Sequence, residues 1–169
     1  LKARGIGVGK SIIDKSKVLS AAELINKAKS KKNIFLPKDV VCSTSVDNGS
    51  AQKVYDITKI PQTQMGLDIG PKTIESFSRH ISESETVIWN GPMGVFESDF
   101  FENGTKSIAN HIASCTQNGL VSIMGGGDTA SALRRFNLED KMSHLSTGGG
   151  ASIELLSGKN LPAIFALEV

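Results

Sequence analysis

The stretch TVIWNGPMGVFE, residues 86–97, decides how this sequence is interpreted, because an apolar run leads directly into a loop with two glycines and a proline. Thr86–Trp89 has the β-branched and aromatic character of a buried strand. The following Asn90, Gly91 and Pro92 suit a close approach of the backbone to another group, since glycine lacks a Cβ and proline fixes its own backbone angle. Apolar side chains at helical spacing come next. The stretch therefore predicts a strand, a loop and a helix in succession.

The same order of strand, glycine loop and helix recurs three more times. The other units begin at MGLDIGP (residues 65–71), LVSIMGGGDT (residues 120–129) and HLSTGGGAS (residues 144–152). Repeated units of this kind are typical of a parallel sheet, and continuous apolar strands fit a sheet that is covered on both faces. We therefore expect an α/β fold with three layers around a parallel sheet, in which a ligand binds beyond the carboxyl ends of the strands.

The part of the chain before these units is less regular. Apolar side chains at helical spacing predict one amphipathic helix over residues 11–32. The apolar runs 34–36 and 40–41, separated by Pro37, predict a strand, which is followed by an irregular excursion and a return up to residue 64. A chain of 169 residues with 39% hydrophobic content supports one compact core, so we expect a single domain over residues 1–169.

Composition and charge narrow the function classes. The net charge of +2, without a long run of one sign, does not favour nucleic acid or an anionic membrane surface as a partner. Cys42 and Cys115 lie far apart and outside any Cys/His cluster, so neither a zinc site nor a disulfide is expected. No apolar run approaches the roughly 20 residues of a membrane helix, and no leader is visible. We expect a cytoplasmic protein, with an organelle left open. Because the chain starts at Leu1 rather than Met, we also expect processing or truncation.

RGIGVGKS, residues 4–11, is similar to the end of a phosphate-binding P-loop but does not complete the pattern. The P-loop motif that ends at Ser11 requires glycine where the sequence has Arg4. The dinucleotide pattern G-x-G-x-x-G fails as well, because Lys10 occupies its last glycine position. We interpret this segment as a loop.

The glycine triplet before Asp128 suits a phosphate group. Gly126 and Gly127 lie at a predicted helix start, where unpaired backbone N–H groups and the helix dipole favour an anion. Asp128 and Thr129 have two interpretations: either residue caps the helix, or Asp128 also binds Mg²⁺, which takes one or two carboxylates together with water and phosphate oxygens.

A second triplet, Gly148, Gly149 and Gly150, repeats this arrangement before another predicted helix. Two helix N-termini that point at one place would form a site for a polyphosphate or a migrating phosphoryl group, which needs fixed donors rather than covalent help.

The NGPMGVFE loop offers groups for the rest of a nucleotide. Glu97 offers a carboxylate to ribose hydroxyls, and Val95 and Phe96 offer an apolar wall for a base; the alternative is a tightly packed loop without a ligand. His80 and His111 fall in helical patterns and are expected at the surface, and His144 is interpreted as structural rather than as a general base.

Several ordered motifs together resemble the C-terminal lobe of the phosphoglycerate kinase family. They are MGLDIGP, NGPMGVFE, GGGDT, DKMSHLSTGGGAS and LLSGKNLPAIFAL, and the resemblance extends over essentially all 169 residues. It implies a Rossmann-like lobe and a reversible phosphoryl transfer of glycolysis, from 1,3-bisphosphoglycerate to Mg-ADP, which gives 3-phosphoglycerate and ATP. It also implies a monomeric parent enzyme whose N-terminal lobe binds the phosphoglycerate.

The resemblance assigns site residues by matching motif. Adenosine is expected at Gly66, Asn90, Gly91, Pro92 and Val95, with the ribose at Glu97. The nucleotide phosphates are expected at Gly126, Gly127, Asp128 and Thr129, with Mg²⁺ on Asp128. The migrating phosphoryl group is expected at the catalytic Gly148, Gly149 and Gly150. The phosphoglycerate lobe, the first strands of the nucleotide lobe and their basic side chains have no counterpart in this sequence. We therefore expect a partial nucleotide-binding domain that does not turn over alone.

Other interpretations stay open at the level of sequence. The chain could be a stand-alone Mg-nucleotide-binding module without catalysis, or an inactive packing or regulatory fragment. A dehydrogenase-type Rossmann domain is weakened by the failed dinucleotide pattern.

Overall fold

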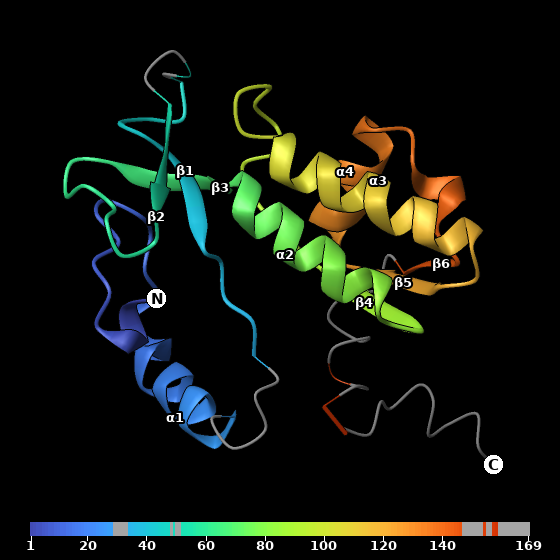
Figure 1. Cartoon of the computed structure of the whole chain (residues 1–169), viewed down its shortest axis with the longest axis horizontal. Helices are drawn as coiled ribbons and strands as arrows, with labels where there is room; N and C mark the ends of the chain where they lie inside the picture. Colours follow the sequence, from blue (N-terminus) through green and yellow to red (C-terminus); the bar gives the residue numbers. More distant parts are fainter. Residues whose placement is uncertain (29–33, 48, 50–51, 147–153, 155–156, 159–169) are drawn as a thin grey trace. The chain divides into compact units, whose positions relative to one another are not determined.

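The computed structural model describes residues 1–28, 34–47, 49, 52–146, 154 and 157–158 (Figure 1). The chain divides into two compact units; two of the three divisions fall within the helices α2 and α3, and the third falls in the loop after β4. Unit 1 comprises Leu1–Ser76 and Met93–Gly104, and unit 2 comprises Phe77–Pro92 and Thr105–Val169. Each unit is described by itself.

From residue 65 to residue 146 the helices and strands follow one another in the order that the sequence predicts, and the helix expected after the second glycine triplet lies outside the described residues. In chain order the described elements are a 3-10 turn at Lys2–Arg4, a second at Lys15–Lys17, α1 (Val18–Ala28), β1 (Asp39–Ser43), β2 (Lys53–Asp56), β3 (Met65–Ile69), α2 (Pro71–Ser82), β4 (Thr86–Asn90), α3 (Asn103–Gln117), β5 (Val121–Gly125), α4 (Gly127–Arg135), a 3-10 turn at Glu139–Lys141 and β6 (His144–Ser146).

Unit 1 contains an antiparallel sheet in the order β2-β1-β3. Val40 of β1 lies opposite Tyr55 on one side and opposite Ile69 on the other, and the register shifts between Val41 and Cys42. Among the described residues, the buried hydrophobic side chains of this unit come from the sheet and from the segment 93–104; they are Val40, Cys42, Leu67, Ile69, Phe96 and Phe101.

A buried carboxylate joins β1 to the start of α2. Asp39, which is 3% exposed, accepts hydrogen bonds from the backbone N–H groups of Thr73 at 2.8 Å and Lys72 at 3.1 Å. The Thr73 hydroxyl donates to the same side chain, with 2.7 Å between Thr73 Oγ1 and Asp39 Oδ1. Asp39 thus pairs N–H groups that the first turn of a helix leaves unpaired.

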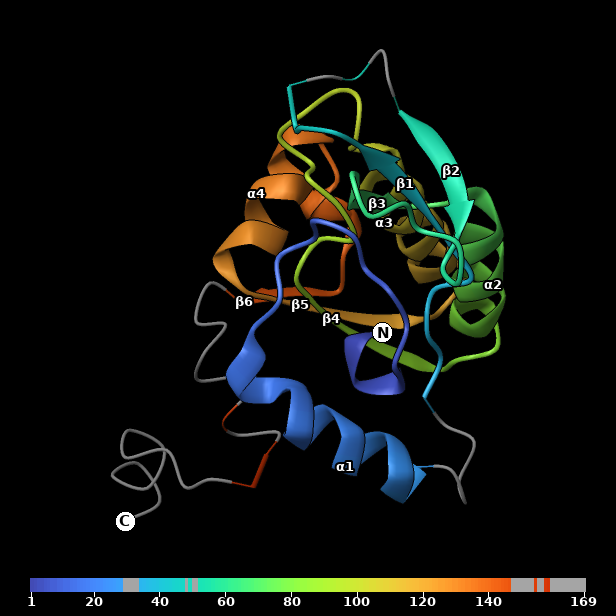
Figure 2. The same cartoon turned by 90° about the vertical axis from the view of Figure 1, so that its left-hand side faces the viewer.

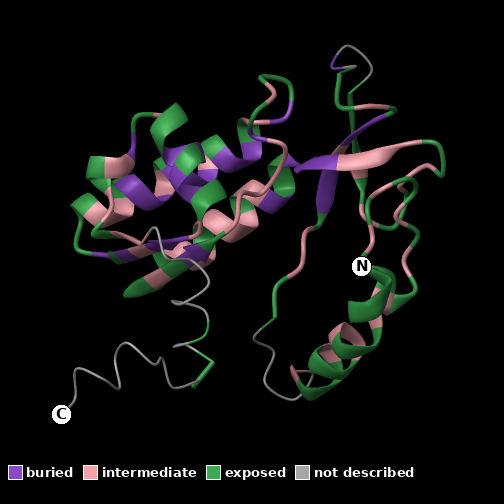
Figure 3. Cartoon of the chain, turned by 180° about the vertical axis from the view of Figure 1, so that it is seen from behind, coloured by how far each residue is buried: buried purple, intermediate pink, exposed green. Residues whose placement is uncertain are grey.

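Unit 2 contains a parallel sheet in the order β4-β5-β6. Helices α3 and α4 lie on the same face of this sheet in both views (Figures 1 and 2). The core between the sheet and the helices is formed by the buried residues Trp89, Ile108, Ile112, Met124 and Leu133, which belong to the purple parts of Figure 3. The predicted α/β class and the parallel sheet are confirmed.

Three sequence-based expectations need correction. The MGLDIGP strand is β3, which pairs antiparallel with β1 rather than joining a parallel sheet. Ile88 and Val121 are 48% and 46% exposed, so the described residues do not cover both faces of the parallel sheet at these positions. Regular helix begins at Val18 rather than near residue 11, because Asp14 caps a separate 3-10 turn through the backbone N–H of Ser16.

Candidate functional site

The carboxyl ends of the three parallel strands lie at one edge of the unit 2 sheet. Asn90 at the end of β4 pairs with Gly125 at the end of β5, and Gly125 pairs with Ser146 at the end of β6. The loops that follow these strands therefore start side by side, as ligand-binding loops of parallel sheets do. The edge combines two of the predicted motifs, NGP and GGGDT.

The turn after β4 is tied to the first turn of α4 by a hydrogen bond. Gly91 has a φ of 95°, which favours glycine, and its N–H donates to Thr129 Oγ1 at 2.7 Å. The Trp89 indole N–H donates to the Gly91 carbonyl at 2.6 Å, so both sides of this peptide turn are held. Thr129 is fully buried, and its hydroxyl positions the turn instead of facing solvent.

The start of α4 is shaped by glycine rather than by a capping side chain. Gly126 is the N-cap residue, with a φ of 95°, and no side chain caps the helix. The interpretation of Asp128 or Thr129 as the cap is therefore wrong. A Cβ added at Gly126 would lie 2.8 Å from Asn90 Oδ1, which is closer than real Cβ contacts allow. Asn90 and Gly126 are thus fitted to each other, and the first N–H groups of α4 have no partner within the helix.

Asp128 lies exposed in the first turn of α4, beside Gly127, where the structure leaves open space next to the backbone. Among the described residues, no group of three or more His, Cys, Asp or Glu side chains could hold a metal ion. Mg²⁺ does not require such a cage, because one carboxylate combined with phosphate oxygens and water suffices. The arrangement of Asp128 therefore fits a magnesium ion that arrives together with a phosphate ligand.

The second glycine triplet, with Gly148, Gly149 and Gly150, lies outside the described residues. The strand that leads to it, β6, ends at Ser146. His144, at the start of β6, is exposed.

The remaining predicted residues belong to unit 1, where Val95 and Glu97 line a pocket of about 400 Å³. The other lining residues are Val46, Asp47, Ser98 and Phe100. The pocket combines apolar walls with acceptor groups, which suits a base and its sugar. Phe96 was expected to form part of the apolar wall, but its side chain is buried in the core with 6% exposure and does not line the pocket.

Gly66 lies in β3 and is held from its backbone side. Its N–H donates to Ser11 Oγ at 2.9 Å. A Cβ at this position would meet Ser11 Oγ at 3.7 Å and Val40 at 3.8 Å, which are ordinary contact distances. Packing within the described part of unit 1 therefore does not require glycine here.

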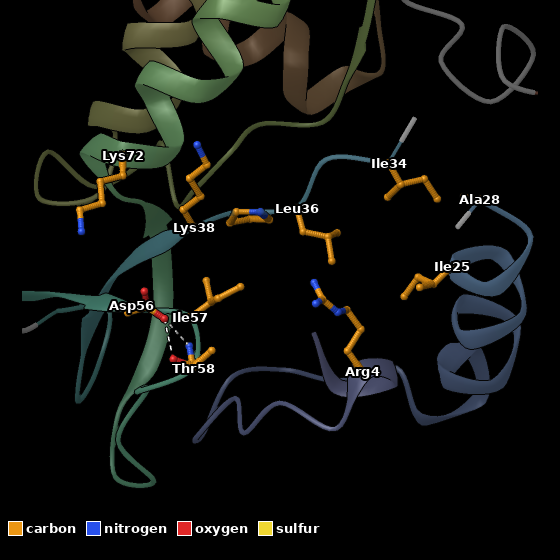
Figure 4. Close-up of a pocket in the computed structure, with 11 residues that line it drawn as sticks. Arg4, Ile25, Ala28, Ile34, Leu36, Lys38, Asp56, Ile57, Thr58 and Lys72 are labelled. Carbon is orange, nitrogen blue, oxygen red and sulfur yellow. Dashed lines mark hydrogen bonds between the residues drawn. The ribbon is translucent and has the colours of Figure 1, made fainter. Parts of the chain in front are cut away.

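A cavity of about 720 Å³ in unit 1 contains none of the predicted site residues (Figure 4). The side chains of Arg4, Ile25, Leu36 and Ile57 converge on it from separate segments of unit 1. At its rim, Asp56 accepts two hydrogen bonds from Thr58, chiefly from its hydroxyl, and these lower the pKa of the Asp56 carboxyl.

Three polar residues near the predicted site were not found from the sequence. Ser11 holds Gly66, Asp47 lines the pocket of Val95, and Asp68 is buried beside the same segment. None of the three had a sequence signal, because their partners lie far away along the chain or depend on the tertiary arrangement; Asp68, for example, accepts from Gly104 N.

Two further expectations concern histidines and membranes. His111 is half-buried rather than at the surface, and its Nε2 lies 2.9 Å from both Ser82 Oγ and the Ser78 carbonyl. His80 is also half-buried.

No helix in the described part of the chain has the length and apolar character needed to cross a membrane.

Comparisons with known proteins agree with one another. The family model described as phosphoglycerate kinase matches residues 1–159. The chain is 48% identical over 169 residues to a phosphoglycerate kinase of Thermosipho africanus and 48% identical over 168 residues to a cytosolic one of Triticum aestivum, with 99% of this chain and 42% of each relative covered. A solved phosphoglycerate kinase from Coxiella burnetii matches with a TM-score of 0.90 at 38% identity, over 99% of this chain and 43% of that one. The chain therefore spans less than half the length of these relatives.

Proposed function

The chain belongs to the phosphoglycerate kinase family, and on this premise we propose that it binds the nucleotide of that enzyme. The reaction is the reversible transfer of a phosphoryl group between 1,3-bisphosphoglycerate and Mg-ADP, with 3-phosphoglycerate and ATP as products. We further propose a cytoplasmic location, as one relative is named cytosolic, and a monomeric enzyme. In this proposal the two compact units belong to one partial nucleotide-binding domain.

One observation carries the proposal for the phosphate side of the nucleotide: the hydrogen bond from Gly91 N–H to Thr129 Oγ1. It joins the NGP turn to the start of α4, where Gly126 and Gly127 leave backbone N–H groups available to phosphate oxygens. Thr129 acts through this bond, so its role is to position the turn. Asn90 and Pro92 fix the direction in which the turn leaves the strand.

Asp128 is the proposed ligand of the magnesium ion. When bound, Mg²⁺ neutralises charge on the phosphate oxygens and holds them in a fixed orientation. The carboxylate of Asp128 is exposed and lies in the first turn of α4, so it can reach an ion on the phosphates without losing an internal partner.

The residues of unit 1 are proposed to bind the nucleoside. Val95 provides an apolar wall for the base, Glu97 accepts hydrogen bonds from ribose hydroxyls, and Gly66 allows close approach of the backbone. The pocket of Val95 and Glu97 supports this assignment by its mixture of apolar and acceptor groups.

Gly148, Gly149 and Gly150 are proposed to donate backbone hydrogen bonds to the migrating phosphoryl group. No Lys or Arg lies within either triplet loop, and Arg134 and Arg135 occupy the last turn of α4. A phosphoryl group in transfer needs positive charge close by, and the loss of such a residue elsewhere costs roughly 10³ to 10⁵ in rate. We therefore propose that these 169 residues bind nucleotide but do not turn over by themselves.

The test is a titration of the 169-residue chain with ADP, with and without Mg²⁺, followed by the fluorescence of its single tryptophan. Trp89 is 5% exposed and is hydrogen-bonded to the Gly91 carbonyl, so it reports on the NGP turn. We expect a saturable change that requires Mg²⁺ and weakens in Asp128→Ala.

Asp140→Ala is the matched control, because Asp140 is also an exposed Asp of unit 2 but lies in the 3-10 turn after α4. It should leave the titration unchanged. A cooperatively folded sample without any response to Mg-ADP would contradict the proposal.

A further inference from the structure

Asp68, in β3, is a buried carboxylate to which the proposed function gives no role. It is 4% exposed, and its two oxygens accept hydrogen bonds from two backbone N–H groups. Gly104 N donates to Oδ2 at 2.6 Å, and Ile69 N donates to Oδ1 at 2.8 Å. Gly104 lies in the first turn of α3, so one carboxylate joins β3 to the start of this helix, at the end of the segment 93–104.

The beginning of the same segment also lies against Asp68. A Cβ at Gly94 would overlap with Asp68 Oδ1, and a Cβ at Gly104 would overlap with the same oxygen. Both ends of the segment therefore approach one carboxylate so closely that only glycine fits. Beside it, Val95 N donates to the Leu67 carbonyl at 2.8 Å.

Two side chains between these two ends are held in the core of unit 1. Phe96 and Phe101 are buried, with 6% and 0% exposure, and the backbone N–H of Phe101 donates to the Ser98 carbonyl at 2.9 Å. Val95 and Glu97, which line the pocket of about 400 Å³, belong to this segment 93–104. A change at the two anchored ends would consequently move the pocket residues together.

We propose that Asp68 is a positioning residue, whose carboxylate holds the segment 93–104 so that Val95 and Glu97 meet the nucleoside. The inference rests on the proposed function of these two residues. Asp68 acts through hydrogen bonds to the backbone and does not touch the nucleotide. Burial raises the pKa of its carboxyl to about 6, against the two hydrogen bonds that lower it, which agrees with an acceptor held away from water.

The test is steady-state kinetics of Asp68→Asn in the protein at its full natural length. Asparagine keeps the shape but has one acceptor oxygen, so its amide group must face one of the two N–H donors. We expect the KM for Mg-ATP, with 3-phosphoglycerate as the acceptor, to rise about tenfold, because a buried donor has lost its partner. The kcat should stay within about twofold. A merely structural role would reduce the folded fraction, which lowers the apparent kcat and leaves KM unchanged.

Asp39→Asn is the matched control. Asp39 is an equally buried carboxylate of unit 1, but it caps α2 through the backbone N–H of Thr73. Its loss should reduce stability without raising the KM for Mg-ATP. An equal rise of KM in both variants would overturn the inference.

A second variant, Gly94→Ala, perturbs the same contact from the other side by placing a methyl group against Asp68 Oδ1. It should raise KM in the same direction. An unchanged KM in either folded variant would overturn the inference, and so would loss of the fold in both, because Asp68 would then serve folding only. Glu97→Ala separates the two proposals. If Glu97→Ala leaves the nucleotide affinity unchanged, the proposed nucleoside-binding role of the segment fails. If Glu97→Ala weakens nucleotide binding while Asp68→Asn keeps the KM of the wild type, only the positioning role of Asp68 is overturned.

Discussion

Thr129→Val tests the NGP turn most directly, because it removes one hydrogen-bond acceptor and changes little else. Thr129 is fully buried, and its Oγ1 accepts from Gly91 N–H at 2.7 Å. Valine keeps the branched shape but offers no acceptor, so the Gly91 N–H loses this partner. An unpaired buried donor costs about 1–3 kcal/mol. Because Gly91 is half-buried and water can reach it in part, we expect the free energy of unfolding to fall by about 1–2 kcal/mol.

The same change should weaken the binding of Mg-ADP. The turn has a φ of 95° at Gly91 and is held by Thr129 on one side and by the Trp89 indole on the other. If the released turn costs the complex about 1.4 kcal/mol more than it costs the free folded protein, affinity falls about tenfold. Urea unfolding followed by Trp89 fluorescence gives the stability, and calorimetric titration of the folded variant with Mg-ADP gives the affinity.

Thr116→Val provides the control for this experiment. Thr116 also belongs to unit 2, and its Oγ1 lies 2.8 Å from both the Ile112 carbonyl oxygen and Ser122 Oγ, within hydrogen-bond distance of each. It should lose stability and keep its affinity for Mg-ADP. The reasoning about the turn is refuted if Thr129→Val loses 1–2 kcal/mol of stability and binds Mg-ADP normally, or if both variants lose affinity equally.

Two further predictions concern ionisable groups. Burial raises the pKa of Asp68 from 3.8 to about 6, so between these pH values the folded protein keeps a proton that the unfolded chain releases. The resulting contribution to the free energy of unfolding is complete below about pH 4 and is lost as the pH rises through 6. Relative to Asp68→Asn, the wild type should lose about 3 kcal/mol between pH 4 and pH 7 in urea unfolding, and a difference independent of pH would contradict the burial of the charge. Burial also raises the pKa of the Cys42 thiol to about 11. At pH 8 a thiol reagent should therefore label the half-buried Cys115 much faster than the fully buried Cys42, as measured by peptide mass spectrometry. Equal labelling rates would contradict this prediction.

The succession of helices and strands between residues 65 and 146 was the predictable part of the fold. Continuous apolar runs gave β4 and β5, and helical spacing gave α2, α3 and α4, because these signals depend on neighbours in sequence. The meeting of the NGP and GGGDT loops was also predictable, since the carboxyl ends of parallel strands share an edge. The hydrogen bond between Gly91 and Thr129 was not, because a fully buried Thr and a capping Thr have the same sequence signal.

The direction of strand pairing was beyond the sequence. β3 is five residues long, and nothing in MGLDI distinguishes a parallel from an antiparallel partner. Exposure was equally hidden in β4, where Ile88 is 48% exposed while its neighbour Trp89 is 5% exposed. A continuous apolar run is compatible with cover on one face or on both, and only the tertiary arrangement decides between them.

The glycines of the candidate site have two different origins. Gly91 is required by its positive φ, and Gly94 by the carboxylate of Asp68, so the fold itself explains them. Gly66 and Gly127 have neither a positive φ nor a neighbour that a Cβ would strike within the described residues. Since glycine weakens a strand or helix in which its freedom is not needed, the described fold supplies no need for glycine at these two positions. Close approach of a ligand to the backbone is such a need, and these two glycines are the positions where the proposed nucleoside and phosphate contacts fall.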